Sequence, residues 1–305
     1  MRRSLLLAVL VFALALVAAA PGAGSERIEV PGYAVTVHYE ARHARVARRV
    51  AAVSEDALPR LTRELGVSTL EPIAMHVVDD LGPYRRALQG ELPEWGVAFA
   101  VLRQRLIVVD VERAARAYGS LDEVIPHELS HLLLVQLTGG VPFPVWFIEG
   151  LAQWQAGEWS LVESWQLMNA VWGGEVPPLR HLLDQYPDAE ARARNAYRLS
   201  YAAFTDLFEG RIDALPAFVA DARDRGSFPE AFAAFTGVPL GQWMADFDQR
   251  LGRRYHSRLL VFQTGPLFSI AAVLFVFVIL RHQLRKRNRL KELERSEGGL
   301  FLDEG

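Results

Sequence analysis

The sequence predicts an α+β protein in which a small strand-containing part precedes a longer helical part. Segments of alternating or continuous apolar character, which are typical of strands, all lie before residue 110, at 33–39, 72–78, 95–100 and 106–109. Segments with apolar residues at helical spacing continue beyond them, at 120–137, 145–154, 195–209 and 240–255. The chain has 305 residues, 51% of them hydrophobic, which is enough for one sizeable domain and for additional membrane segments.

Composition excludes several classes of function. The formal net charge is −3, so nothing indicates nucleic acid as a partner. There is no cysteine, which excludes disulfides, cysteine-ligated metals and a cysteine nucleophile. A cysteine-free chain is ordinary for an exported bacterial protein, because a domain of this size needs no covalent cross-links.

Both ends of the chain predict contact with a membrane. Residues 1–24 have the features of a secretory signal: two arginines, an apolar stretch at 5–17 and a run of small residues after it. An uncleaved anchor is the alternative for this segment. Residues 259–280 are apolar and uncharged. At about 1.5 Å per residue they would span roughly 33 Å, enough for a hydrocarbon layer of about 30 Å.

Basic residues follow this apolar run directly, as expected for a cytoplasmic flank. We therefore expect one transmembrane helix over 259–280 and a short cytoplasmic tail over 281–305. The domain over 25–256 would lie outside the cytoplasm, attached to a bacterial cell membrane by this single span. Within the domain we separate an α/β part, 25–138, from a helical part, 139–256.

The elements of the domain follow from local patterns. The strand at 33–39 precedes a helix at 41–65 that ends at Gly66. The strand at 72–78 ends in a turn rich in Asp, Gly and Pro, and the last two strands form a hairpin joined near 103–105. Ser120 is a suitable cap for the next helix. Amphipathic segments then predict further helices, at 145–154, 195–209, 215–222, 228–235 and 240–255.

The helix at 120–137 carries the strongest functional motif, in which His127 and Glu128 are followed by His131. Two residues four apart on a helix lie about 40° apart around its axis, so both imidazoles can reach one metal ion. Glu128 projects from the same turn and is placed to hold and deprotonate a metal-bound water. The rest of the helix is apolar, which predicts that these polar side chains are buried and need a partner.

Glu149 is the candidate third ligand. It follows His131 after a turn at 138–140 and lies on the helix at 145–154, where Gly150 and Ala152 permit close packing against the metal helix. Two histidines and one carboxylate leave a fourth position for water and substrate, which is typical of catalytic rather than structural sites. We expect one zinc ion, because this ligand set suits zinc best. The alternative is a helix with two hydrogen-bonded core histidines and no metal.

At these residues the chain resembles the gluzincin metallopeptidases of the Peptidase MA clan. It is most similar to bacterial peptidase-MA-like domains, whose Trp-Phe-x-Glu-Gly-x-Ala signature corresponds to residues 146–152. The resemblance covers about 95–255. It implies a thermolysin-like fold with a small mixed sheet, an edge strand that pairs with the substrate backbone, a zinc helix and a C-terminal helical subdomain. It also implies zinc ligands at His127, His131 and Glu149, and a general base at Glu128.

The resemblance bears on three further positions. The stretch at 97–100 has no acidic residue where the aminopeptidase branch has one, which favours endopeptidase activity. Gln153 stands where some gluzincins have an acid that orients a histidine ligand, and an amide can still hydrogen-bond the ring. Tyr197 matches the spacing of the tyrosine that donates a hydrogen bond to the oxyanion. Tyr201 is the second candidate, and packing tyrosines at both positions are the alternative.

These observations predict a membrane-anchored, extracytoplasmic zinc metallopeptidase that acts on a peptide or protein substrate. A zinc-bound water would attack the peptide bond, with Glu128 as the general base. The alternative is a non-catalytic, membrane-tethered module that binds zinc or a partner.

Overall fold

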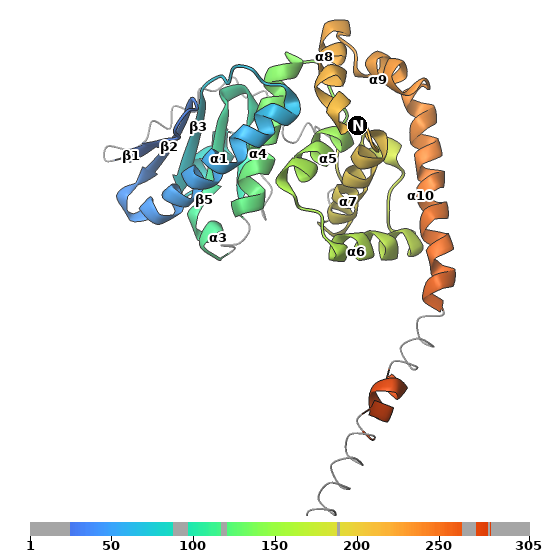
Figure 1. Ribbon diagram of the computed structural model, residues 1–305. Coiled ribbons are helices and arrows are strands. Elements are labelled where there is room, and N and C mark those ends of the chain that lie inside the picture. Colours follow the sequence, from blue (N-terminus) through green and yellow to red (C-terminus); the bar gives the residue numbers. More distant parts are fainter. Residues whose placement is uncertain are drawn as a thin grey trace, which may run out of the picture. The chain divides into compact units, whose positions relative to one another are not determined.

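The structure is a computed structural model, which describes residues 25–87, 97–116, 121–187, 190–263, 273–279 and 281 (Figure 1). It divides into two compact units, Met1–Arg250 and Leu251–Gly305. The sheet and the helices up to α9 belong to the first unit, and α10 (Leu240–Gln263) runs from the first unit into the second.

A five-stranded mixed sheet forms the first part of the chain. Its strands, in chain order, are β1 (Ser25–Glu29), β2 (Val35–Glu40), β3 (Ile73–Val78), β4 (Ala98–Val101) and β5 (Leu106–Asp110). Their order in the sheet is β1-β2-β3-β5-β4. The β2–β3 and β3–β5 pairs are parallel, whereas β1–β2 and β4–β5 are antiparallel. The chain therefore places β4, the last strand but one, at an edge of the sheet.

Alternating side chains give the sheet two different faces. Met75 is fully buried on the face covered by α1 (Ala44–Leu65), where Ser54 lies against its sulfur. On the opposite face Tyr84, from α2 (Gly82–Ala87), packs in a small apolar cluster with Phe99 and Val108. The helix α4 (Leu121–Thr138) packs beside α1 and also contacts β4. This packing brings the middle of α4 next to the sheet edge.

The second part of the unit is helical and is built around aromatic side chains. It contains α5 (Val145–Ala156), α6 (Leu161–Trp172), α7 (Glu190–Leu207), α8 (Leu215–Arg225) and α9 (Phe228–Thr236). The remaining elements are α3 (Val111–Arg116) and four short 3-10 helices, η1 (Ala41–His43), η2 (Leu102–Gln104), η3 (Leu179–Leu182) and η4 (Ile212–Ala214). Phe147 is fully buried on α5, and its ring lies 5.2 to 6.2 Å from five phenylalanine rings. Because α5 contacts both α4 and α7, it joins the two parts of the unit.

Gly150 is the point of closest approach between α5 and α7. A β-carbon at this position would lie 2.4 Å from the carbonyl oxygen of Ser200 and 2.6 Å from the β-carbon of Phe204, both on α7. Our expectation that Gly150 permits close packing against the metal helix was therefore wrong about the partner. The absence of a side chain serves the α5–α7 contact.

The predicted C-terminal transmembrane helix, and with it that part of the predicted fold class, requires correction. Among the residues that the structure describes, no helix is long and apolar enough to cross a membrane. The helix α10 carries several charged residues, which are costly inside a bilayer: Asp246, Asp248, Arg250, Arg253 and Arg254.

Several predicted features lie outside the described residues. They are the signal sequence at 1–24, the start of the strand at 95–96, the Ser120 cap, residues 264–272 and 280 of the apolar run, and nearly all of the tail at 281–305.

Candidate metal centre

The helix α4 places His127 and His131 side by side in an apolar environment. Their rings meet edge to face, with centroids 4.8 Å apart, and the two residues are 8% and 5% exposed. The neighbouring apolar side chains of this helix are fully buried: Ile125, Leu129, Leu132 and Leu133. Polar rings in such surroundings need hydrogen-bonding or metal partners, as the sequence predicts.

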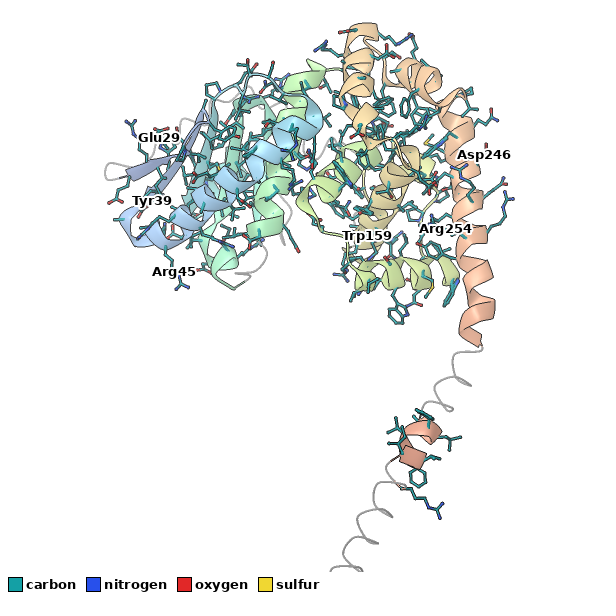
Figure 2. All side chains as sticks on the ribbon, viewed as in Figure 1. Glu29, Tyr39, Arg45, Trp159, Asp246 and Arg254 are labelled. Carbon is teal, nitrogen blue, oxygen red and sulfur yellow. The ribbon has the colours of Figure 1, made fainter. Side chains whose placement is uncertain are left out.

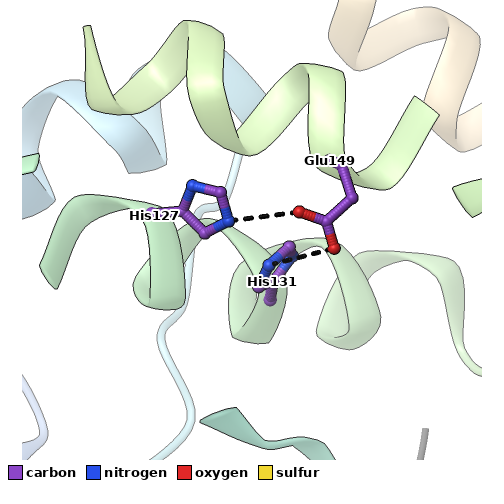
Figure 3. Close-up of side chains that lie close together, drawn as sticks. All are labelled: His127, His131 and Glu149. Carbon is purple, nitrogen blue, oxygen red and sulfur yellow. Dashed lines mark hydrogen bonds and ion pairs between the residues drawn. The ribbon is translucent and has the colours of Figure 1, made fainter. Parts of the chain in front are cut away.

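Glu149 supplies that partner from α5 (Figure 3). Its Oε2 lies 3.3 Å from Nε2 of His127, and its Oε1 lies 3.8 Å from Nε2 of His131. The three potential ligand atoms all lie within 4.8 Å of one another. The fold thus brings together the three predicted ligands, although one of them lies on a different helix. This cluster could bind a metal ion.

The donor set fits a small divalent cation. In a tetrahedral site with ligand bonds of about 2.0–2.1 Å, neighbouring donor atoms are about 3.3 Å apart. Nε2 of His127 is at this distance from Oε2 of Glu149, and Nε2 of His131 is half an ångström farther than this from the other oxygen, Oε1. One donor atom from each residue lies within 4.8 Å of the others, so the ligands would have to draw closer around an ion. Two imidazoles and one carboxylate are also ligands that a transition metal of this size accepts.

The charges in the cluster are unequally distributed. Burial lowers the pKa of His131 to about 4, which leaves this imidazole neutral and able to act as a ligand. Burial also opposes the charged form of His127, but the carboxylates of Glu158 and Glu149 outweigh it and raise the pKa of His127 well above the usual value. For Glu149 burial is outweighed by the two histidines, which lower the pKa of its carboxyl. The group between the rings is therefore an anion.

Glu128 lies beside the cluster, and whereas the pKa of Glu149 is lowered, that of Glu128 is raised. Burial raises the pKa of its carboxyl to about 8, and the negative charges of Glu149 and Glu158 act in the same direction. His127 and a hydrogen bond with the backbone of Ala100 partly oppose this rise. A carboxyl with a pKa near neutrality can take up and release a proton at physiological pH.

The hydrogen bond with Ala100 links Glu128 to the edge strand β4. The Asp110 amide donates to the Val97 carbonyl over 2.9 Å, so Val97 and Asp110 form a hydrogen-bonded pair of the antiparallel ladder. Such pairs alternate along two antiparallel strands. The main-chain groups of Ala98 and Ala100 therefore point away from β5, toward the side of β4 on which the described residues place no further strand. The predicted edge strand is present, and this outer side adjoins Glu128.

The structure places Gln153 differently from our expectation. Its amide group donates to the carbonyl oxygens of Glu149, at 3.1 Å, and Tyr197, at 2.9 Å. It thus joins α5 to α7 through main-chain atoms. The Nδ1 atom of His127 is instead 2.7 Å from a carboxylate oxygen of Glu158, a residue that we did not predict. Glu158 directly follows Gly157, and a glycine that ends a helix and reverses the chain was the available signal.

The two candidate tyrosines have different surroundings. The pKa of Tyr197 is raised well above its usual value by burial and by the charges of Glu149, Glu128 and Glu158, so this hydroxyl lies within the field of the site. Burial alone raises the pKa of Tyr201, whose ring stacks on Trp159 at 4.1 Å. Trp159 lies between α5 and α6 (Figure 2). Of the two tyrosines, Tyr197 is therefore the one associated with the cluster.

Tyr186 is a further aromatic residue at the site that we did not predict. Its ring stacks on Tyr197, with centroids 4.5 Å apart, and its hydroxyl lies 2.7 Å from Oγ of Ser200. The Ser200 hydroxyl donates to the carbonyl of Ala196, so it can accept a hydrogen bond from Tyr186. The Tyr186 ring, held by this hydrogen bond, therefore supports the ring of Tyr197 by stacking on it.

No family model, curated protein or solved structure matches this chain. The function proposed below is therefore supported by the chemistry of this cluster and its surroundings.

Proposed function

We propose that the protein is a zinc-dependent metallopeptidase that hydrolyses internal peptide bonds in a peptide or protein substrate. One observation carries the proposal: three metal-ligand side chains converge in apolar surroundings, and a carboxyl with a raised pKa lies directly beside them. A cluster that only satisfied two buried histidines would not require this additional acid.

The proposed ligands of zinc are His127, His131 and Glu149. When bound there, zinc would act as a Lewis acid that polarises the substrate carbonyl and lowers the pKa of water. The protein side chains have separate roles. His131 is neutral, and His127 must give up a proton to the solvent when the cation binds.

Glu128 is the proposed general base. It accepts a proton from the attacking water and delivers it to the leaving amine. Its pKa of about 8 in the metal-free protein places the carboxyl near the range in which both transfers are efficient, and a bound cation would lower this value. The hydrogen bond with Ala100 fixes the carboxyl at the sheet edge, where the substrate would bind.

The free side of β4 is the proposed docking site for the substrate backbone. An extended peptide can add to an exposed sheet edge through main-chain hydrogen bonds. The Ala100 amide already donates to Glu128, so Ala98 and the carbonyl of Ala100 are the main-chain groups left for a substrate. The stretch at 97–100 contains no acid that would bind a free amino terminus. Cleavage within a chain is therefore favoured over removal of its first residue.

Tyr197 is the proposed donor to the oxyanion that develops on the substrate carbonyl. Its raised pKa keeps the hydroxyl protonated, which a hydrogen-bond donor requires. The stacked ring of Tyr186 limits the motion of Tyr197 and supports this role.

The test combines metal analysis with peptide cleavage. We expect one equivalent of zinc per chain, and cleavage of amino-terminally blocked and unblocked peptides that a chelator abolishes and added zinc restores. A protein that binds zinc but cleaves no member of a diverse peptide library would contradict the peptidase proposal and favour a non-catalytic zinc-binding module.

A further inference from the structure

Both ring nitrogens of His127 have partners in the structure. Nε2 faces Glu149 at 3.3 Å, and Nδ1 lies 2.7 Å from Oε1 of Glu158. An ionised carboxylate can only accept hydrogen bonds, so Nδ1 must carry the proton of this contact. By the same reasoning Nε2, which faces Glu149, also carries a proton when no cation is bound. When a cation displaces that proton, Nδ1 keeps its own, and the Nε2 lone pair is directed toward the side where Glu149 and His131 lie.

We propose that Glu158 is a positioning residue of the metal centre, which holds His127 in the tautomer and orientation that Nε2 needs to bind the cation. Hydrogen bonds of this kind typically strengthen metal binding, because they fix the ligand ring and increase its basicity. The proposal rests on the proposed function, since it requires a metal ion in the cluster. It adds a residue from outside the three ligands and the general base.

The position one helical turn after Glu149 cannot take this role here. Gln153 lies at that position, and its amide hydrogens bind the main-chain oxygens of Glu149 and Tyr197. The bond to Tyr197 holds α5 against α7, and a carboxylate at this position could not donate either bond. The orienting acid has to come from another part of the chain.

The end of α5 delivers Glu158 to His127. Gly157 has a positive φ of 73°, and the amide of Glu158 donates to the carbonyl of Gln153 over 3.2 Å. This pattern closes the last turn of a helix and reverses the chain direction. A residue that comes after the helix can therefore return to a side chain on the neighbouring helix α4.

Two contacts hold the short segment after Glu158. The Trp159 ring stacks on Tyr201 with only 2° between the ring planes. Ser160 then caps α6, because its side chain accepts a hydrogen bond from the amide of Glu163 at 3.2 Å. Glu158 is thus fixed between the end of one helix and the start of the next, which suits a residue that must hold another in place.

The experiment measures zinc affinity of the full chain by competition with a chromophoric chelator. We expect Glu158→Ala to weaken zinc binding about 10- to 100-fold and Glu158→Gln to weaken it less, because the amide oxygen can still accept from Nδ1. Glu175→Gln, at an exposed position on the loop after α6, is the matched control for loss of one negative charge and should leave the affinity unchanged.

A second readout separates positioning from a general effect on stability. In the zinc-loaded protein the Nδ1 proton of His127 should give a slowly exchanging resonance in nuclear magnetic resonance spectra, and this signal should be lost in Glu158→Ala. The side chain of Glu158 is 28% exposed, so its removal should leave no large cavity. If Glu158→Ala fails to fold, the zinc affinity and the Nδ1 proton signal are measured in Glu158→Gln instead.

Two affinity results would overturn the role of Glu158: an unchanged zinc affinity in both Glu158 variants, or an equal loss of affinity in Glu175→Gln. A persistent Nδ1 signal in Glu158→Ala would do the same. Failure of the unaltered chain to bind zinc would instead refute the proposed function, so the two failures can be told apart.

Discussion

Glu128 and Glu149 are acids at the same site, yet their surroundings move their pKa values in opposite directions. Burial dominates at Glu128 and raises its pKa to about 8, whereas two histidines outweigh burial at Glu149 and lower its pKa. The difference arises from the helices that carry them: Glu128 faces the edge strand, and Glu149 faces the imidazoles. Two acids with pKa values pushed apart can perform two tasks, and here we infer metal binding for one and proton transfer for the other.

The largest expected effect comes from substitution of Glu149, the acid to which we assign metal binding. Glu149→Ala removes the anion between the two rings, so we expect loss of zinc from the isolated protein and loss of detectable peptide cleavage. Metal analysis and a peptidase assay on the same sample measure both. Full zinc content in this variant would show that Glu149 is not a ligand. The division into a metal-binding acid, Glu149, and a proton-transferring acid, Glu128, would then fail.

Glu128→Gln is the complementary change. We expect this variant to retain zinc, because the three ligands are intact, and to lose about 10²- to 10⁴-fold in kcat, the usual contribution of a general base. Steady-state kinetics alongside zinc analysis provide the comparison with Glu149→Ala. Cleavage at the rate of the unaltered protein would remove Glu128 from the mechanism.

Tyr197→Phe tests the contribution of α7. Removal of one oxyanion donor typically lowers kcat about 10²- to 10³-fold, and the aromatic ring that stacks on Tyr186 remains. Tyr201→Phe is the matched control and should have little effect, because its ring packs on Trp159. Equal losses of kcat in the two variants would argue against a specific hydrogen bond from Tyr197.

The pH dependence should report on Glu128 as well. A base must be ionised to accept a proton, so kcat/KM should fall as the pH falls through the pKa of Glu128, by about tenfold per pH unit below it. That pKa is about 8 without metal and lower with a cation bound. A pH profile of the zinc enzyme measures the effect, and the residual activity of Glu128→Gln should not show this acidic limb.

The smallest expected effect comes from a change in the packing of α5, the helix that carries Glu149, against α7. Gly150→Ala would place a methyl group 2.4 Å from the Ser200 carbonyl, and we expect a loss of about 1–3 kcal/mol in the free energy of unfolding. Gly241→Ala is the control, because a β-carbon at Gly241 meets no atom within 4 Å. Denaturant unfolding of both variants gives the comparison. An unaffected Gly150→Ala would indicate that α5 and α7 can move apart at little cost.

The sequence predicted those parts of the site that follow from local geometry. The spacing of His127 and His131 on one helix is a property of the helix itself, and the apolar residues around them indicate burial. The contact of Glu149 with the two histidines was also predicted, because its spacing from His131 allows a turn at 138–140 and a second helix. Alternating or continuous apolar segments predicted the strands β2, β3, β4 and β5, whereas the mixed sheet and its edge strand were implied by the resemblance to the gluzincins.

The missed features depend on packing and on chain direction. The role given to Gln153 assumed that its side chain points to α4, whereas the close approach at Gly150 turns it toward the main chain of α7. Glu158 reaches His127 only because the chain reverses at Gly157. The C-terminal span was predicted from the length of an apolar run and from the basic residues after it, but no helix among the described residues is long and apolar enough to cross a membrane.

The shortness of β4 bears on how readily the protein aggregates. Exposed strand edges promote aggregation, because another sheet can pair with them and propagate. β4 has four residues, Ala98–Val101, of which only two present main-chain groups outward. An edge this short can pair with a brief extended stretch of polypeptide but offers little to the sheet of a second folded copy.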